Sequence, residues 1–465
     1  MVRCPCARTR ASASRPVAST SRRTAWPFSW PAREAGRRAW PAREAGRRAP
    51  GAPASLARMA SLVLRGANVV DGTGAGPVRE GVIAVEGERI AQVGGRPPTG
   101  VELDLGGLTV VPGLIDAHAH LTLVDLADLS GRRTPVAVTA ARIFHVCDVA
   151  LDSGFTTVRD AGGADGGLAD ATRLGLVRGP RILPSGPILC QSGGHGDLRD
   201  PFDHHGRDEG LPGLVQASMR IDGADSARLA AREVFRRGAT QLKVAVSGGV
   251  VSSTDRIEDV QLTVEELRAV VAEAQARETY VLAHAHNVGG IRNGLAAGVR
   301  SFEHASLLDE DTAHAIAAAG AYVVPTLAVL HLMELEWQEW GLPEAVLPRL
   351  EGLEDAMSRS VKLAAAAGVP LGSGSDLLGP EQRHRGMELT LKSRLLGPME
   401  ALVSATRTNA ELLERADDIG TITEGKLADL VAFDGDPLQD PELFDQPERI
   451  VLVVQSGKVV KDLRA

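Results

Sequence analysis

One stretch decides the fold of this chain: Val110-Val111-Pro112-Gly113-Leu114-Ile115-Asp116-Ala117-His118-Ala119-His120. It is an apolar run that ends in two histidines separated by a single residue. Side chains alternate along an extended strand, so His118 and His120 point to the same side of the backbone. Neutral imidazole is a good ligand for borderline metal ions such as zinc. The stretch therefore predicts a buried strand that presents two metal ligands at its carboxyl end.

Further short apolar runs follow this stretch, and Ala-rich helical stretches alternate with them. Such alternation is typical of parallel strands joined by crossover helices. The predicted strands span residues 113–116, 156–159, 181–184, 241–246, 280–284, 301–304, 321–325 and 370–373. Predicted helices include residues 224–237, 264–277, 288–298 and 309–319, the second with Thr263 and Glu266 in capping-box spacing. Eight strand–helix units predict an α/β fold, a (β/α)8 TIM barrel.

Further candidate ligands lie at or just after the ends of later predicted strands. They are Lys243, His284, His304 and Asp376. Barrel enzymes build their active sites at these strand ends. Together with the two histidines of the first strand, these residues form the set that a two-metal hydrolase needs. Each motif alone would be weak, so the shared placement carries the prediction.

Both ends of the chain carry β-rich patterns. Short runs at residues 62–64, 68–70, 81–85, 89–93 and 109–111 predict a small antiparallel sheet. Matching runs return at residues 429–433 and 450–454. We expect residues 59–112 and 420–465 to pair as a small accessory β-sandwich domain. The hydrolase barrel would then occupy residues 113–419.

Residues 1–58 differ sharply in composition from the rest. They hold thirteen Arg and two Glu, a local charge of +11, which leaves −19 for residues 59–465. They also contain a perfect tandem repeat of ten residues, 30–39 and 40–49. We expect a disordered leader, with a mistaken start before Met59 favoured over a targeting role because no apolar segment follows an Arg pair. The acidic remainder argues against a nucleic-acid partner.

The overall composition is ordinary for a soluble enzyme. The chain has 465 residues, of which 44% are hydrophobic and 24% charged, enough for a large core. No run of about eighteen apolar residues occurs, so we expect no membrane span. The cysteines fit neither a zinc finger nor a disulfide framework, which favours a cytoplasmic protein. They are Cys4, Cys6, Cys147 and Cys190.

Longer motifs carry a resemblance to a known family. They are residues 111–120, Gln191-Ser192-Gly193-Gly194-His195-Gly196-Asp197, Lys243-Val244-Ala245-Val246-Ser247-Gly248-Gly249-Val250, Ala283-His284-Ala285-His286, Phe302-Glu303-His304 and Gly425-Lys426-Leu427-Ala428-Asp429-Leu430. With them the chain, from Met59 onward, resembles the metal-dependent amidohydrolase superfamily. More narrowly, it resembles the imidazolonepropionase-related branch, which includes Xaa-Arg/Lys and Xaa-Pro type dipeptidases and ochratoxin-hydrolysing amidases.

The resemblance implies that Lys243 is carbamylated and bridges two zinc ions. A carbamate carries two oxygens, one for each metal, and a lowered amine pKa would let Lys243 react with carbon dioxide. Asp376 would accept the proton of a metal-bridging hydroxide during attack and return it to the leaving nitrogen. The implied reaction is hydrolysis of an amide C–N bond in a dipeptide, an N-acyl amino acid or an aryl amide. The implied ligands are His118, His120 and Asp376 for one zinc, and His284 and His304 for the other.

Several residues keep alternatives open. Lys243 could instead bind a substrate carboxylate, which would leave one metal. His286 could replace His284 as a ligand or face the substrate, and family position favours His284. Substrate binding and loop packing are both open for His195, which lies among glycines. The pair His204-His205 fits a solvated lid loop better than a second metal cluster.

Other side chains are candidates for shaping the substrate pocket. Trp337 and Trp340 could line an apolar pocket or a subunit contact, although packing of a helical face is favoured. The guanidinium groups of Arg220 and Arg228 suit a substrate carboxylate.

Other functions use similar machinery. A mononuclear deaminase or an imidazolone-type hydrolase of cyclic amides would not need a carbamylated lysine. An organophosphate or ester hydrolase would use nearly the same site. A metal-free scaffold belongs to a different class, and retention of all six ligand positions argues against it. The expected partner is a small molecule, and the resemblance also raises self-association into a homo-oligomer.

Overall fold

The structure is a computed structural model that describes residues 61–464, except 97, 130, 132, 200–201, 203–209, 212, 253, 343 and 380–381. The predicted leader at residues 1–58 and the His204-His205 pair lie outside the described residues. None of the helices in the described ranges is long and apolar enough to cross a membrane.

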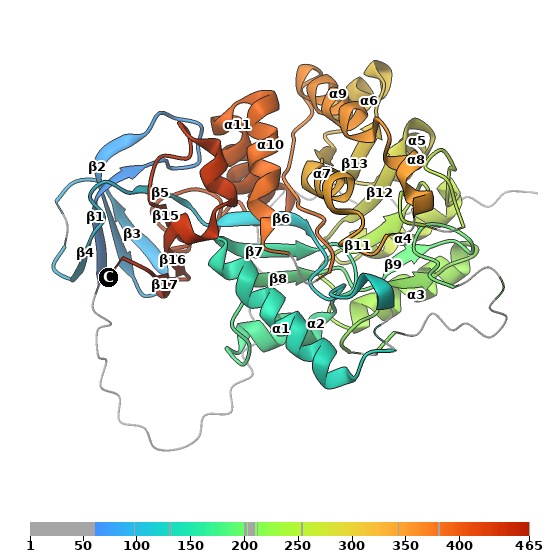
Figure 1. The fold of residues 1–465 in the computed structure, drawn as a ribbon, viewed down its shortest axis with the longest axis horizontal. Coiled ribbons are helices and arrows are strands. Elements are labelled where there is room, and N and C mark those ends of the chain that lie inside the picture. The colour runs from blue at the N-terminus through green and yellow to red at the C-terminus, as the bar shows by residue number, and fades with distance from the viewer. Residues whose placement is uncertain are drawn as a thin grey trace, which may run out of the picture. The chain divides into compact units, whose positions relative to one another are not determined.

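Strands from both ends of the described chain form one eight-stranded sheet (Figure 1). Its order is β17-β16-β15-β5-β1-β2-β3, with β4 paired to β1. The ends meet where β5 and β15 run antiparallel, with Val111 opposite Val431. The strands are β1 (Leu62–Val69), β2 (Val78–Glu86), β3 (Arg89–Val93), β4 (Val101–Asp104), β5 (Thr109–Pro112), β15 (Leu430–Phe433), β16 (Ile450–Gln455) and β17 (Lys458–Asp462).

The predicted antiparallel sheet is mixed, because two of its pairings are parallel. β1 pairs in parallel with both β4 and β5. The reason is the connection after β3, which crosses back to the start of β1 instead of reversing in a hairpin. There the Val101 N–H donates to the Ser61 carbonyl at 2.7 Å. One apolar cluster, including Leu64, Val110 and Leu430, spans strands from both chain ends.

Parallel strands form the remaining two sheets, of three and six strands. Their orders are β6-β7-β8 and β10-β9-β11-β12-β13-β14. Seven of these strands overlap predicted ones, whereas the short β9 and β10 were not predicted. The bounds are β6 (Leu114–Ala119), β7 (Phe155–Asp160), β8 (Arg181–Pro184), β9 (Ile188–Cys190), β10 (Ser218–Arg220), β11 (Leu242–Ala245), β12 (Val281–Asn287), β13 (Ser301–Leu307) and β14 (Tyr322–Val324).

The predicted strand at residues 370–373 is wrong as a strand, although the segment lies beside β14. Only an isolated bridge joins it to Val323. The Asn409 side chain accepts from the Ser373 N–H at 3.0 Å and donates to the Ser373 carbonyl at 2.8 Å. That carbonyl also accepts from the Ala117 N–H of β6, at 2.9 Å. The Ser373 N–H thus donates to the Asn409 side chain, where a regular strand would supply a backbone carbonyl.

Helices separate the parallel strands along the chain and pack around them (Figure 1). Apolar side chains of α3, α4 and α5 share a buried cluster with those of β11, β12 and β13. The predicted capping box is present, with Thr263 and Glu266 each accepting from the other's backbone N–H. The helices are α1 (Val136–Asp152), α2 (Gly166–Arg173), α3 (Ala224–Arg236), α4 (Val264–Gln275), α5 (Val288–Ala297), α6 (Glu310–Ala318), α7 (Leu327–Glu336), α8 (Leu347–Leu350), α9 (Leu353–Ala366), α10 (Met387–Leu396), α11 (Pro398–Val403) and α12 (Asn409–Leu412).

Candidate metal centre

His118 of β6, His120 just after the end of that strand and Asp376 form the first group of candidate ligands. The Nε2 atoms of His118 and His120 lie 3.3 and 3.2 Å from Oδ1 of Asp376. Ligand atoms of a tetrahedral zinc ion lie about 3.3 Å apart, given bond lengths of about 2.0 Å. The spacing of these three donors therefore fits a shared metal ion.

Hydrogen bonds on the far side of both rings fix which nitrogen is free. Nδ1 of His118 donates to Glu303 Oε2 at 2.7 Å, and Nδ1 of His120 donates to the Gly162 carbonyl at 2.8 Å. With the proton on Nδ1, the neutral form of each ring has its lone pair on Nε2, the atom that faces Asp376. This is the tautomer that a metal ligand needs.

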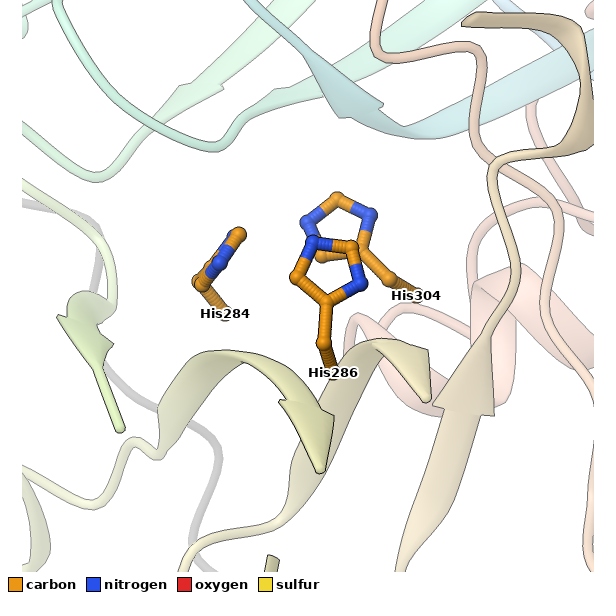
Figure 2. A group of neighbouring side chains, drawn as sticks. All are labelled: His284, His286 and His304. Atoms are coloured by element: carbon orange, nitrogen blue, oxygen red, sulfur yellow. The ribbon is translucent and has the colours of Figure 1, made fainter. Parts of the chain in front are cut away.

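Three more histidines form the second group, with nitrogen atoms within 4.8 Å of one another. Figure 2 shows their rings gathered above the ends of β12, which carries His284 and His286, and β13, which carries His304. His284 donates from Nε2 to the Gly248 carbonyl at 3.1 Å, which leaves the lone pair on its Nδ1. Nδ1 of His304 is hydrogen-bonded to the Thr326 hydroxyl at 2.8 Å, so Nε2 is the ring nitrogen that is not engaged in this bond.

The three imidazoles of the second group are neutral in this environment. Burial lowers the pKa of His284 and His304 well below the ordinary value, and neighbouring histidines lower both further. Burial also lowers the pKa of His286 to about 3. A histidine must be deprotonated to bind a metal, so this cluster is prepared for one.

Lys243, on β11, lies fully buried beside the first group. Its Nζ is 3.5 Å from Nε2 of His118. Burial lowers the pKa of this amine to about 8, although the charges of Glu303 and Asp376 oppose the shift. About a tenth of the amine is therefore uncharged and nucleophilic at pH 7.

His195 packs directly on the second group. Its ring stacks on that of His284, with centroids 3.9 Å apart and planes 14° apart. Its Nδ1 is buried and has no hydrogen-bond partner in the described part of the chain. Gly249 lies against the ring, because a Cβ added there would be 2.3 Å from Nδ1. Packing therefore covers the ring, and its Nδ1 is left without a hydrogen-bond partner among the described residues.

All eight predicted site residues line one cavity of about 220 Å³. Its other walls are mostly apolar and come from several separate parts of the chain. The apolar lining residues are Leu123, Leu129, Ile188, Leu198, Ala217, Val250, Val251, Val329, Leu330, Met333 and Leu378.

The side chains proposed to shape this pocket lie elsewhere. Arg220 and Arg228 are not among the described lining residues, and Arg228 pairs with Asp225 at 2.8 Å on α3. Trp340 packs in an apolar cluster with α7, α8 and α9, as helix packing predicts. Neither Trp340 nor Trp337 lines the cavity.

Glu303 and Arg159 support the site but were missed from the sequence. The Arg159 guanidinium donates to both carboxylate oxygens of Glu303 at 2.9 Å, and both side chains are fully buried. Burial alone would raise the pKa of Glu303, but Arg159 and His118 hold it at about 2. The ionised Glu303 can therefore keep His118 in its metal-binding tautomer. An acidic residue within a buried strand was the signal available in the sequence.

Two of the predicted ligands adopt strained backbone conformations. His304 has φ of 68° and Asp376 has φ of 56°. Positive φ in a non-glycine residue costs about 1–3 kcal/mol and is concentrated at functional sites. The surrounding structure maintains this strain, which directs both side chains into the cavity.

Glu303→Gln is expected to weaken zinc binding by about 10–100-fold. The glutamine amide can accept a hydrogen bond from Nδ1 of His118 or donate one to it, so it no longer fixes the tautomer of the ring. It also lacks the negative charge that stabilises the proton on Nδ1. Zinc affinity would be measured by competition with a chromogenic chelator. Exposed Glu102, which pairs with Arg65 at 3.1 Å, provides the matched control as Glu102→Gln. Unchanged zinc affinity in Glu303→Gln would contradict this role.

Comparison with known proteins identifies the family. The profile of the amidohydrolase family matches residues 109–460, so the chain belongs to that family. It is 32% identical over 364 residues to an ochratoxinase from Aspergillus niger, covering 76% of this chain and 75% of the relative. An imidazolonepropionase from Agrobacterium fabrum is 28% identical over 407 residues, covering 78% and 86%.

A solved structure is also similar throughout. It is a prolidase complexed with N-methylphosphonate-L-proline, 39% identical, with a TM-score of 0.83. The match covers 86% of this chain and 100% of that chain. The predicted resemblance is thereby confirmed, and the chain is an enzyme, a hydrolase that acts on C–N bonds.

Proposed function

We propose that this enzyme is a binuclear zinc amidohydrolase that cleaves the amide C–N bond of a small substrate. Suitable substrates are a dipeptide, an N-acyl amino acid or an aryl amide of the ochratoxin type. One observation carries the proposal: two groups of metal-binding side chains, together with Lys243, face a single cavity. The similarity to an ochratoxinase and a prolidase supports the substrate class.

In this proposal carbamylated Lys243 would help to hold both zinc ions. The lowered pKa of its amine supports carbamylation, because the uncharged amine reacts with carbon dioxide. When bound, the ions would activate a water molecule and polarise the amide carbonyl. The protein ligands are His118, His120 and Asp376 for one ion, and His284 and His304 for the other.

Asp376 is the proposed proton carrier. Its carboxylate lines the cavity, with Oδ1 at 3.3 and 3.2 Å from Nε2 of His118 and His120. It can accept a proton from the attacking water and then donate it to the leaving nitrogen. Without that second transfer the nitrogen would have to leave as an unstable anion.

His195 and His286 are proposed to contact the substrate. His195 lines the cavity and its buried Nδ1 has no hydrogen-bond partner among the described residues, and His286 is held by a 2.9 Å hydrogen bond between its Nδ1 and the Ser306 hydroxyl. The apolar walls suit a substrate with an aliphatic or aromatic side chain. In this assignment His286 is a substrate residue, with His284 as the ligand.

A second candidate function is a mononuclear deaminase or a hydrolase of cyclic amides. The similarity to an imidazolonepropionase favours it. Such an enzyme would bind one metal and leave Lys243 uncarbamylated, free to bind a substrate carboxylate. A metal-free scaffold would give no role to the five buried histidines that form the two groups of candidate ligands.

Metal analysis and an amide screen test the proposal together. Protein purified without chelator is expected to hold about two zinc ions per chain and to release C-terminal amino acids from dipeptides, N-acyl amino acids or aryl amides. Removal of zinc with a chelator should abolish cleavage, and its return should restore it. One ion per chain with cleavage of cyclic amides would favour the second candidate, whereas no metal and no cleavage after zinc addition would refute both.

We propose in addition that the parallel strands close into a (β/α)8 barrel. Backbone hydrogen bonds across the gaps between sheets support closure, from Thr240 N–H to the Pro184 carbonyl at 2.9 Å and from Gly372 N–H to the Val323 carbonyl at 2.8 Å. Pairing of β5 with β15 supports the accessory domain at residues 59–112 and 420–465. Cytoplasmic location and self-association stay predictions.

A further inference from the structure

The loop of residues 248–252 forms part of both the metal centre and the substrate cavity. The Gly248 carbonyl holds Nε2 of His284, and Gly249 packs on the ring of His195. The next three residues, Val250, Val251 and Ser252, line the cavity. The position of this loop therefore affects one candidate ligand, one candidate substrate residue and one wall of the pocket.

Regular secondary structure does not hold this loop, because β11 ends at Ala245. A residue from a distant part of the chain holds it instead. NH1 of Arg349, on α8, donates to the carbonyls of Gly249 at 3.3 Å, Val250 at 3.2 Å and Ser252. Three backbone acceptors thus converge on one cationic nitrogen. Hydrogen bonds from a charged donor are stronger than those between neutral groups.

Packing places Arg349 firmly beside the loop. Leu350, the next residue, shares a buried apolar cluster with Val250 and with the pocket residues Leu330 and Met333. On the opposite side, the Gly249 N–H donates to the Asp255 carboxylate at 3.2 Å. Residues 249–252 are therefore fixed by Asp255 at the Gly249 N–H and by Arg349 at their carbonyls. Gly248, which contacts His284, is held separately, because its N–H donates to the Asp259 carbonyl at 3.1 Å.

We infer that Arg349 is a positioning residue that fixes the apolar wall of the substrate pocket by holding the 248–252 loop. This inference rests on the proposed function, because it concerns the fit of an apolar substrate group. Arg349 touches neither the candidate ligands nor the cavity, so it acts through the loop. Its removal loosens the wall around a bulky substrate group, whereas a small group depends on that wall much less.

The test compares Arg349→Ala with the parent protein and with Arg359→Ala, an exposed arginine on α9. Two substrates of one amide series are used, one with a bulky apolar side chain and one with glycine in its place. For the bulky substrate, KM is expected to rise about tenfold while kcat changes less than about threefold. For the glycine substrate both constants stay close to the parent values, and zinc content is unchanged.

Chemical rescue makes the assignment specific. Added guanidinium should lower the raised KM of Arg349→Ala, because it can occupy the carbonyl site, and Arg349→Lys should show an intermediate KM. Guanidinium should have no such effect on Arg359→Ala. Equal loss of kcat for both substrates, or no change in KM for either, would overturn the inference.

Amide hydrogen exchange separates this inference from the proposed function. The backbone amides of residues 248–252 are expected to exchange at least about tenfold faster in Arg349→Ala than in the parent, while those of β12 stay protected. If the parent cleaves no amide, the proposed function fails. The exchange rates still test whether Arg349 holds the 248–252 loop in place. Unchanged exchange at residues 248–252 would refute the role of Arg349.

Discussion

Lys243→Ala is expected to abolish amide hydrolysis and to reduce the zinc content below two ions per chain. The reason is the loss of the proposed bridge, the one group shared by both metal sites. Removing a residue that merely orients a ligand weakens metal binding by about 10–100-fold, and removing the bridging ligand should cost more. Elemental analysis and turnover of the best substrate would be measured on the same preparation.

Exposed Lys362, on α9, provides the matched control as Lys362→Ala, which should keep two zinc ions and full activity. Lys243→Ala must also fold, which circular dichroism can check. If Lys243→Ala kept both metals and near-normal turnover, the bridging assignment would be wrong. If it kept one metal and near-normal turnover, the mononuclear function would gain support.

Asp376→Asn is expected to lower kcat by about 100- to 10,000-fold, the usual contribution of a positioned acid–base group. The amide can neither accept the proton of the attacking water nor return one to the leaving nitrogen. KM should change much less, because the cavity walls are untouched. Steady-state kinetics with added zinc would measure both constants, since Asn is also a weaker metal ligand than Asp.

Two comparisons distinguish proton transfer from metal loss. Zinc content at saturation should approach two ions per chain in Asp376→Asn, even where more zinc is needed to reach it. A substrate whose leaving group needs no proton, such as a nitrophenyl ester, should lose less activity than an amide. The exposed Asp434→Asn variant should behave like the parent. Equal losses on ester and amide would argue against proton delivery by Asp376.

Local pattern predicted the parts of the site that depend on one strand at a time. Alternation along β6 placed His118 and His120 on one side, and the same alternation placed His284 and His286 together on β12. Alternation could not decide whether His284 or His286 is the ligand, because residues two apart in a strand point in the same direction. Helix α4 was likewise predictable from its own capping residues.

Contacts between distant segments could not be predicted in this way. The pairing of Arg159 with Glu303 joins β7 to β13, and the sequence of neither strand indicates which residue the other contributes. Residues 370–373 resembled a strand locally, but Asn409 from a distant helix satisfies Ser373 instead. The parallel pairing of β1 with β4 and β5 likewise depends on the path of the connection, not on the strands themselves.

The sheet shared by the two chain ends has a consequence for synthesis on the ribosome. Strands β1 to β5 emerge early, but β15, which covers the free edge of β5, emerges only near the end. At about 5–20 residues per second, the nascent chain exposes that edge for many seconds. β5 leads directly into β6, which carries His118 and ends just before His120. The first of the proposed metal ligands to be made are thus attached to a strand whose neighbour is among the last, and chaperone protection of this edge should govern the yield of active enzyme.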